Sequence, residues 1–489
     1  MSRTVIVSNR VPTPAGKSTH AGGLTVVLED AIKPGTLWFG WSGKTASHTA
    51  QDINVVERNG VDYVTFDLSE DIYKKFYVGF SNGTLWPLFH FRLNAIEFHR
   101  EQLEGYRAAN EAFAEVLAKL VSPDDVIWVH DYHLIPLAAA LRRRGLRNRI
   151  GFFLHVPFVP PSAFAVLPQG EELLGDFCAY DVVGFQTETH RQDFIDCIRR
   201  ILGYPVDPNG CMSTPMRSVE LIVAPVGIDS VQFSRRAELS ARSRNSQRLT
   251  ESLGERCLMI GVDRLDYSKG LPNRFEAFSR LLTRYPEHRS RVSFLQIAAP
   301  SREDVPEYAA LRPVLNRMAG DINARHGTFD WVPLRYMSQP LARSTLAGFY
   351  RHACVGVVTP FCDGMNLVAH EFLAAQDPEN PGVLLLSKFA GAASYFKDAL
   401  IVNPYDTEEL SQAIHNALEM PSDERTARMG RMREQVREHN VYRWAGDLIG
   451  ELTGIRLGKV DALKPRAPVA AMPSREFEEV AAGVRRHRG

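Results

Sequence analysis

Short apolar segments recur along the 489-residue chain, and they constrain its fold more than any other feature. Most are continuous apolar runs rather than alternating patterns, which is typical of strands buried on both faces of a sheet. Amphipathic helical patterns lie between them, so we expect an α/β fold with parallel sheets covered by helices on both faces. The expected strands span residues 4–8, 126–129, 150–155, 182–185, 221–224, 258–262, 292–297, 355–359, 384–387 and 400–402.

The length of the chain predicts two domains, because a single hydrophobic core rarely serves so many residues. A polar stretch at residues 234–251 separates two sets of expected strands. We therefore expect two Rossmann-like, doubly wound parallel-sheet domains that face a cleft. The expected units are an N-terminal domain at 1–235, a second domain at 236–445, a helix at 446–463 that returns to the first domain, and a mobile tail at 464–489.

The charges of the chain are balanced, since Lys plus Arg and Asp plus Glu both total 57. A balanced chain gives no general reason to expect nucleic acid or an anionic membrane as a partner. The apolar runs are too short for a signal-peptide core or a membrane span, so we expect a cytoplasmic protein. The six cysteines form no CxxC pair and no cluster with zinc-ligand spacing, so the sequence predicts no metal site.

Two segments offer groups that suit phosphates. Gly22 and Gly23 precede an amphipathic helical pattern, and free amides at the start of a helix attract anions. Arg264 and Lys269 follow an expected strand and suit a diphosphate. Both segments also have an ordinary interpretation, as a plain turn and as a solvated loop in which neighbouring aspartates pair with the two cations. The dinucleotide-binding pattern G-x-G-x-x-G is absent from the first turn.

The segment DGMNLVAHEF follows another expected strand. Gly364 and Met365 place amides near the start of the next helix, where an anion can bind. Leu367 and Glu371 are four residues apart and share one helix face, so the carboxylate can accept hydrogen bonds from a ribose diol. The alternative is that Asp363 is an N-cap and Glu371 an ordinary surface charge.

Aromatic and polar residues gather in three further segments. Tyr77 and Trp86 lie in FYVGFSNGTLWPLFHFR, and such rigid rings either stack on sugars or pack in a core. Residues 130–133 and His155 follow two expected strands, whose ends meet at one sheet edge. The contiguous HDYH run is poor metal-ligand geometry, because neighbouring strand residues point to opposite faces.

Taken together, these segments resemble the trehalose-6-phosphate synthases. The shared motifs occur in the order of that family, from residue 4 to about 406: SNR, AGGL, FSNGTLWPLFHFR, IWVHDYHL, FFLHVPF, GFQTE, DRLDYSKGLPNR, SR at 301–302, DGMNLVAHEF, AAQDPENPGVLLLSKFAGAA and IVNPYD. The resemblance implies the two-domain GT-B fold with an active site between the domains. It also implies retaining transfer of glucose from a nucleotide-glucose, UDP-glucose foremost, to glucose 6-phosphate, with no cofactor, in a homo-oligomer that is a tetramer.

The resemblance also assigns roles to residues. The acceptor side, for glucose 6-phosphate, comprises Arg10, Tyr77, Trp86, Asp131, Tyr132, Gln186 and Arg302. The donor side comprises Gly22, Gly23, His155, Arg264, Lys269, Asp363, Gly364, Met365, Asn366, Leu367, Val368 and Glu371. Among these, the expected catalytic residues are His155, Asp363, Arg264 and Lys269. Two departures bear on the choice of donor base: Cys362 stands where the family usually has a basic residue, and His370 where it usually has lysine.

Three other functions are weighed against this one. A related synthase with another phosphorylated acceptor, such as glycerol 3-phosphate, would keep the donor motifs but lose the sugar-stacking aromatics. A catalytically inactive sensor of sugar phosphates would tend to lose the cations or the DGMN loop. A nicotinamide dehydrogenase would need the missing glycine pattern. For the transfer itself we expect front-face substitution, because the candidate carboxylates all have other tasks.

Overall fold

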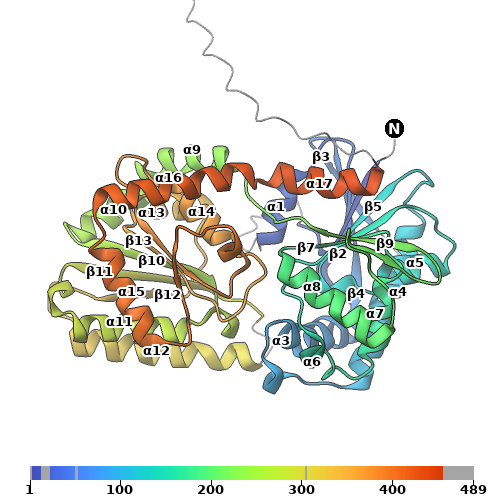
Figure 1. Ribbon diagram of the computed structural model, residues 1–489, viewed down its shortest axis with the longest axis horizontal. Helices are drawn as coiled ribbons and strands as arrows, with labels where there is room; N and C mark the ends of the chain where they lie inside the picture. The colour runs from blue at the N-terminus through green and yellow to red at the C-terminus, as the bar shows by residue number, and fades with distance from the viewer. Residues whose placement is uncertain (1–2, 13–22, 50–52, 303–305, 455–489) are drawn as a thin grey trace, which may run out of the picture.

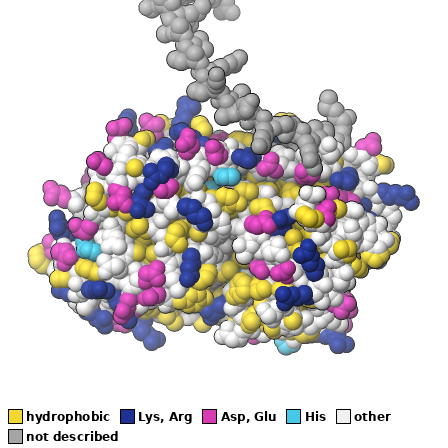
Figure 2. All heavy atoms as spheres, in the orientation of Figure 1, with side chains coloured by type: hydrophobic (Ala, Val, Ile, Leu, Met, Phe, Trp, Pro, Cys, Tyr) yellow, Lys and Arg dark blue, Asp and Glu magenta, His cyan; other side chains and the backbone are white. Residues whose placement is uncertain are grey.

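The protein folds into two parallel-sheet domains that lie side by side (Figure 1), and the prediction of the fold class is confirmed. The structure is a computed structural model that describes residues 3–12, 23–49, 53–302 and 306–454. The predicted tail at 464–489 therefore lies outside the described residues. Acidic and basic side chains are interspersed over the face drawn in Figure 2.

The first domain contains a nine-stranded sheet in the order β3-β4-β2-β1-β5-β6-β7-β9-β8. Only the two edge strands, β3 and β8, run antiparallel to their neighbours. Its strands are β1 Thr4–Arg10, β2 Leu37–Ala46, β3 Asn54–Arg58, β4 Val61–Ser69, β5 Val126–His130, β6 Ile150–Phe153, β7 Val182–Phe185, β8 Cys211–Ser213 and β9 Ser218–Val223. Its helices are α1 Gly23–Ala31, α2 Glu70–Tyr73, η1 Lys74–Leu85, α3 Trp86–Phe89, η2 Leu93–Ala95, α4 Arg100–Ala118, η3 Tyr132–Leu134, α5 Leu137–Arg143, α6 Pro161–Phe164, α7 Gly170–Phe177, α8 Glu188–Cys197 and η4 Ile198–Leu202.

The second domain contains a six-stranded, fully parallel sheet in the order β12-β11-β10-β13-β14-β15. Its strands are β10 Cys257–Arg264, β11 Val292–Ala299, β12 Leu334–Met337, β13 Val355–Val358, β14 Val383–Ser387 and β15 Leu400–Val402. The remaining helices are α9 Ser230–Ala241, α10 Arg244–Leu253, η5 Tyr267–Lys269, α11 Leu271–Arg284, η6 Pro286–His288, α12 Pro306–His326, α13 Arg343–His352, α14 Leu367–Ala375, η7 Gly391–Ser394, α15 Thr407–Leu418, α16 Ser422–Glu438 and α17 Val441–Thr453.

The chain crosses between the domains twice, and the two crossings touch. The first lies between β9 and α9, because α9 packs on α13 and α14 of the second domain. The division predicted at residue 235 therefore falls inside α9. The second crossing lies between α16 and α17. A Cβ on Gly227 would come within 1.9 Å of the carbonyl oxygen of His439, so only glycine lets the crossings pack this closely.

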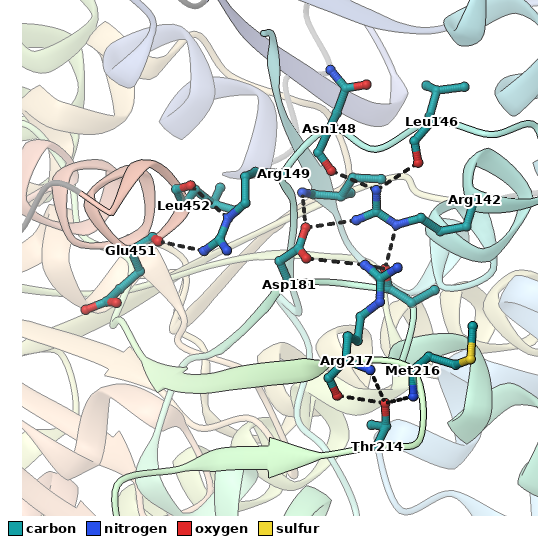
Figure 3. Close-up of polar contacts among 12 residues, drawn as sticks. Arg142, Leu146, Asn148, Arg149, Asp181, Thr214, Met216, Arg217, Glu451 and Leu452 are labelled. Atoms are coloured by element: carbon teal, nitrogen blue, oxygen red, sulfur yellow. Dashed lines mark hydrogen bonds and ion pairs between the residues drawn. The ribbon is translucent and has the colours of Figure 1, made fainter. Parts of the chain in front are cut away.

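Helix α17 returns to the first domain and packs against α1 and the strands β6 and β7, as the ribbon in Figure 1 shows. It begins at Val441, before the range 446–463 predicted for the returning helix. Its buried Trp444 lies 4.8 Å from Trp128, centroid to centroid, on β5. At the other end the guanidinium of Arg149 donates to the carbonyl oxygens of Glu451 and Leu452 (Figure 3), which satisfies carbonyls that a helix end leaves unpaired.

An ion network fixes the strands under this contact (Figure 3). The carboxylate of Asp181 accepts hydrogen bonds from Arg142 at 2.9 Å, from Arg217 at 3.3 Å and from the backbone amide of Ile150 at 2.7 Å. These partners come from α5, the β8–β9 turn and the start of β6. The network ties the amino ends of the strands together, so the carboxyl ends at the opposite edge are held in a fixed array.

Candidate active site

The predicted site residues follow the carboxyl ends of strands in both sheets. Asp131 follows β5 and His155 follows β6 in the first domain, while Arg264 ends β10 and Asp363 follows β13 in the second. The two edges meet. The backbone of Gly364 passes so close to His155 that a Cβ on Gly364 would lie 1.9 Å from the His155 carbonyl oxygen. The predicted site residues of the two domains therefore meet at the interface between the domains.

Lys269 and Asp363 form a buried ion pair. The Nζ atom of Lys269 lies 2.5 Å from Oδ2 of Asp363, and the side chains are only 9% and 15% exposed. Asn366 also donates to Oδ2 of Asp363, at 2.9 Å. Burial raises the pKa of Asp363, but Lys269, with smaller contributions from His90 and Arg264, opposes this and the pKa lies below its usual value. The solvated-loop alternative is therefore wrong for Lys269, but it describes Arg264, whose side chain is 38% exposed and pairs with Asp266 at 3.7 Å.

Arg274 positions the loop that carries these cations. It lies in the first turn of α11, is fully buried, and donates to Asp263 at 2.5 Å, to Gln296 at 2.8 Å and to the hydroxyl of Thr359 at 2.9 Å. It also donates to the carbonyl oxygen of Lys269. A planar, always charged guanidinium with all three nitrogens hydrogen-bonded makes a rigid brace. Sequence reasoning missed it, although it lies within the quoted motif DRLDYSKGLPNR.

Arg302 reaches from the second domain onto aromatic residues of the first. Its guanidinium carbon lies 3.7 Å from the ring centroid of Trp86, and it donates to the hydroxyl groups of Tyr308 at 2.7 Å and Tyr132 at 3.1 Å. Arg264 lies over the same indole ring, at 5.2 Å. Such contacts between guanidinium groups and aromatic faces are favourable. Trp86 is 4% exposed and carries both arginines on its ring, and its contact with a sugar stays a prediction.

A chain of hydrogen bonds links Arg302 to Tyr132 and, through Asn82, to the backbone of Tyr77. The hydroxyl of Tyr132 donates to Oδ1 of Asn82 at 2.9 Å, and Asn82 in turn donates to the carbonyl oxygen of Tyr77. Asn82 and Tyr77 lie in η1, a wide π-helical segment, and such segments are frequent at functional sites. Sequence reasoning used Tyr77 and Tyr132 but missed Asn82, which joins them.

Asp131 is held in a strained backbone conformation, with φ of 74°. Its Oδ1 accepts a hydrogen bond from the amide of His155 at 3.3 Å. Burial raises the pKa of Asp131 to about 6, although the backbone amides of Tyr132 and His155 and the charges of Arg302 and Arg264 lower it. Strain of this kind costs about 1–3 kcal/mol and is concentrated at functional sites.

His155 is paired with a second histidine that sequence reasoning had only grouped with its neighbours. Nε2 of His155 lies 3.0 Å from Nδ1 of His130, which is fully buried at the end of β5. Burial lowers the pKa of His155 to about 3 and holds that of His130 well below its usual value. Both rings are therefore neutral, and each can donate one hydrogen bond and accept another.

Glu371, the predicted ribose ligand, lies in an ion triad that spans the domains. Arg343 on α13 donates to Oε1 of Glu371 at 3.0 Å and to Oδ2 of Asp30 on α1 at 3.4 Å. Burial raises the pKa of Glu371 and of Asp30, and Arg343 opposes this in both cases. The alternative that Glu371 is an ordinary surface charge is therefore wrong, since its side chain is 15% exposed. Sequence reasoning missed Arg343, which lies outside the quoted motifs.

The other predicted acceptor residues differ in their relation to Arg302: Tyr77 acts on it electrostatically, whereas Arg10 and Gln186 make no contact with it among the described residues. Arg10 is exposed at the end of β1, over Gly43, and no contact joins it to Arg302 among the described residues. Tyr77 stacks on His133, with centroids 5.7 Å apart. Gln186 is buried, and its Oε1 accepts from the amide of Val226 at the first crossing. Its side-chain oxygen thus holds the crossing, and contact with a sugar stays a prediction.

The loop at residues 363–366, which precedes α14 and carries predicted donor-binding residues, packs between two other backbone segments. Gly364 lies against the segment at His155, and a Cβ on Gly391 would lie 1.9 Å from the carbonyl oxygen of Gly364. Asn366 precedes α14 with φ of 72°, so a left-handed turn starts this helix. The predicted Met365, Leu367 and Val368 lie around the same turn, and Gly23 at the start of α1 packs against Leu367. Gly22 lies outside the described residues.

The two departures from the family pattern are both neutral. Cys362 is 8% exposed, and burial raises the pKa of its thiol to about 12. His370 is 1% exposed with its ring against Phe396, and burial lowers its pKa to about 4. Neither side chain supplies the positive charge that is usual at these positions.

Comparison with known proteins gives consistent results. The family described as glycosyltransferase family 20 matches residues 2–454. A trehalose-6-phosphate synthase of Sinorhizobium fredii is 46% identical over 457 residues, which cover 93% of this chain and 98% of the relative. Another of Cronobacter sakazakii is 45% identical over 453 residues, covering 92% and 95%.

Solved structures agree in fold. An α,α-trehalose-phosphate synthase (UDP-forming) from Burkholderia xenovorans, in complex with glucose-6-phosphate, superposes with a TM-score of 0.89 and 44% identity, covering 93% of this chain and 100% of the other. A trehalose-6-phosphate protein from Escherichia coli bound with UDP-2-fluoro glucose gives a TM-score of 0.87 and 42% identity, covering 92% and 99%.

Proposed function

Because the chain belongs to glycosyltransferase family 20, we infer that it transfers glucose from UDP-glucose to glucose 6-phosphate and releases UDP and α,α-trehalose 6-phosphate. The relatives at 42–46% identity share this activity by name, and one is solved with glucose-6-phosphate bound. The named alternatives, a glycerol 3-phosphate synthase and an inactive sensor, have no such support.

One observation carries the reaction geometry: the guanidinium groups of Arg264 and Arg302 lie over the same indole ring of Trp86. Two cations at one point suit two phosphates that meet there, the diphosphate of the donor and the phosphate of the acceptor. Arg264 and Lys269 would bind the diphosphate, and Arg302 the 6-phosphate. The attraction of Arg264 and Lys269 for the diphosphate strengthens as the glycosidic bond breaks, because the leaving oxygen becomes more negative, and this stabilises the transition state.

We propose front-face substitution for the chemical step. The acceptor hydroxyl oxygen forms the new bond to C1 on the side from which UDP leaves, the bond from C1 to the phosphate oxygen breaks, and that phosphate accepts the hydroxyl proton. A carboxylate nucleophile would have to be free, but each candidate is engaged: Asp363 pairs with Lys269, and Glu371 pairs with Arg343. Asp131 accepts from the amide of His155. Catalysis then depends on orientation and charge stabilisation.

The test of the mechanism is intact mass after incubation with UDP-2-fluoroglucose. We expect no covalent glycosyl adduct, together with an α,α-linked product from the natural donor. A stable adduct on Asp131, Asp363 or Glu371 would establish double displacement and remove the front-face proposal.

The test of the function is steady-state kinetics with UDP-, GDP- and ADP-glucose against glucose 6-phosphate. We expect the highest kcat/KM with UDP-glucose, and no turnover when glycerol 3-phosphate replaces glucose 6-phosphate. Turnover of glycerol 3-phosphate alone would support the related synthase. Tight binding of glucose 6-phosphate without any turnover would support the sensor.

Two further properties remain proposals. We propose that the reaction needs no cofactor, so that a chelator leaves kcat unchanged. We also propose a homo-oligomer, a tetramer by resemblance to the family, which light scattering of the purified chain would test. Within the described residues no helix has the length and apolar character needed to cross a membrane.

A further inference from the structure

A pair of histidines in the second domain lies far from the cleft and has no part in the proposed reaction. Nε2 of His288, in η6, lies 2.9 Å from Nδ1 of His415, on α15. Between Lys269 and η6 runs α11, which has 14 residues and so spans about 20 Å. The pair therefore lies at the sheet edge opposite the active site, where α11 and α15 pack together (Figure 1).

Carboxylates adjoin this pair. One oxygen of Glu287, one nitrogen of His288 and one of His415 all lie within 4.8 Å of one another. Oε1 of Glu419 lies 4.0 Å from Nδ1 of His288, the ring nitrogen that does not face His415. In the described part of the chain, no lysine or arginine forms an ion pair with Glu287 or Glu419. Burial and the neighbouring His415 lower the pKa of His288, and the carboxylates of Glu419 and Glu287 oppose this shift while Arg291 adds to it.

The rings are held in place before any ligand binds. His288 is 4% exposed, and the ring of His415 stacks on Tyr285 with centroids 4.0 Å apart and planes within 8°. The hydroxyl of Tyr285 is itself hydrogen-bonded to Gln412, one turn before His415 on α15. Preorganised imidazoles lose little side-chain freedom on binding, which favours affinity.

Two imidazole nitrogens and a carboxylate are ligands that zinc accepts, whereas calcium and magnesium prefer oxygen alone. A tetrahedral site with bonds of about 2.0–2.1 Å needs its two nitrogens about 3.3 Å apart. The two nitrogens would have to move apart by only a few tenths of an ångström from 2.9 Å, but both rings would also have to turn, because hydrogen-bonded nitrogens point at each other rather than at a shared ion. Oε1 of Glu419 lies 4.0 Å from the non-ligating nitrogen of His288, so it would have to move closer to accept that proton and act as the carboxylate partner usual for a metal-bound histidine.

We propose that Glu287, His288 and His415 bind a divalent transition metal of the zinc class, with water as the fourth ligand, and that this metal ties η6 to α15. The competing explanation is a plain hydrogen bond between two neutral histidines. The histidines are 127 residues apart, so no spacing pattern in the sequence predicts such a site. The site is structural in this proposal and takes no part in glucose transfer.

The experiment is titration of the full-length, tag-free protein with ZnCl₂ by calorimetry and thermal unfolding, after treatment with a chelator. We expect one Zn²⁺ per chain, and at 100-fold excess over Kd a rise in Tm of about 5 °C. Co²⁺ added instead should give the visible absorption of a four-coordinate site. No binding heat and no rise in Tm would overturn the proposal.

Three variants localise the binding. His415→Gln keeps a partner for His288 but removes a ligand, so the affinity should fall by more than about 10-fold. Glu287→Gln changes an exposed side chain and so cannot fail merely through misfolding; it should also weaken binding. His352→Gln is the matched control, because His352 bonds the carbonyl oxygen of Ala241 elsewhere in the domain. Zn²⁺ binding that is equal in all three variants would contradict the assignment.

Discussion

The buried pair of Lys269 and Asp363 allows the contributions to stability and to catalysis to be separated. Exposed ion pairs contribute about 0–1 kcal/mol, but this pair has side chains only 9% and 15% exposed. Removing one partner of a buried pair costs about 3–5 kcal/mol, because the other charge is left buried without compensation. Lys269→Met and Asp363→Asn should therefore each lower Tm by about 10 °C, since 1 kcal/mol shifts Tm by about 2–4 °C in domains of this size.

The double variant Lys269→Met/Asp363→Asn should recover most of this loss. Replacing both members of a buried pair by neutral groups of similar shape is often neutral for stability. Activity should not recover, because Lys269 is also needed to stabilise the leaving diphosphate. We expect kcat to fall by at least about 100-fold in Lys269→Met and in the double variant alike.

The assay is thermal unfolding of the four proteins without ligand, together with turnover at saturating UDP-glucose and glucose 6-phosphate. Lys119→Met is the matched control, because Lys119 pairs with Glu115 on the surface of α4, where the side chains are 62% and 47% exposed. That variant should change Tm by less than about 4 °C. If the two single losses simply add in the double variant, the pair is not coupled and the reasoning fails. If Lys269→Met keeps near-normal turnover, the catalytic assignment of Lys269 fails.

Three further outcomes are expected. The pKa of Asp131 in the folded protein is about 6, above its value in the unfolded chain, so the buried charge lowers stability increasingly as pH rises from about 4 to 6 and by a constant amount above that. Asp131→Asn should therefore abolish turnover, and it should raise Tm at pH 7.5 but not at pH 4.5. An equal change in Tm at both pH values would contradict this. Gly364→Ala should lower kcat more than about 100-fold, because the new Cβ would lie 1.9 Å from the His155 carbonyl oxygen. The control Gly175→Ala should leave kcat unchanged, because its Cβ would meet no atom within 4 Å. Similar kcat values for the two variants would contradict the domain contact. Arg302→Lys should lower kcat/KM for glucose 6-phosphate by at least about 100-fold, because lysine cannot reproduce the contacts of the guanidinium with the ring of Trp86 and the hydroxyls of Tyr308 and Tyr132. A change confined to the KM for UDP-glucose would show that Arg302 belongs to the donor side.

Most interior strands could be predicted from the sequence because both of their faces are buried, but the interior strands β2 and β4 were not predicted. Every expected strand overlaps one of the two sheets. The edge strands β3 and β8 were not predicted, because solvent on one side leaves them with the polar composition of loops. β12 has only four residues, and three of them are half-buried. β2 begins with five buried residues, so the same criterion of continuous burial should have found it.

Site residues could be predicted where a motif directly follows a strand. Their ion-pair partners could not be predicted where the partner comes from a helix or loop far away in the sequence. Lys269 and Asp363 were both identified, but their pairing depends on two loops 94 residues apart. Arg343 meets Glu371 and Asp30 only because the start of α13 comes within reach of both α14 and α1. No local pattern distinguishes this arginine from the many others in the chain. Motifs thus locate a site, while the tertiary fold decides which charges are neutralised there.

Backbone strain gives an independent indication of where the function lies. Seven described non-glycine residues have positive φ, and three of them are predicted site residues: Asp131 at 74°, Arg302 at 51° and Asn366 at 72°. Left-handed backbone is costly for a side chain such as that of arginine, so the surrounding contacts must impose it. Asp131 follows β5, Arg302 follows β11 and Asn366 precedes α14, so each lies at the end of a strand or the start of a helix. The fold therefore accepts a local cost at the three points where groups from the two domains must meet.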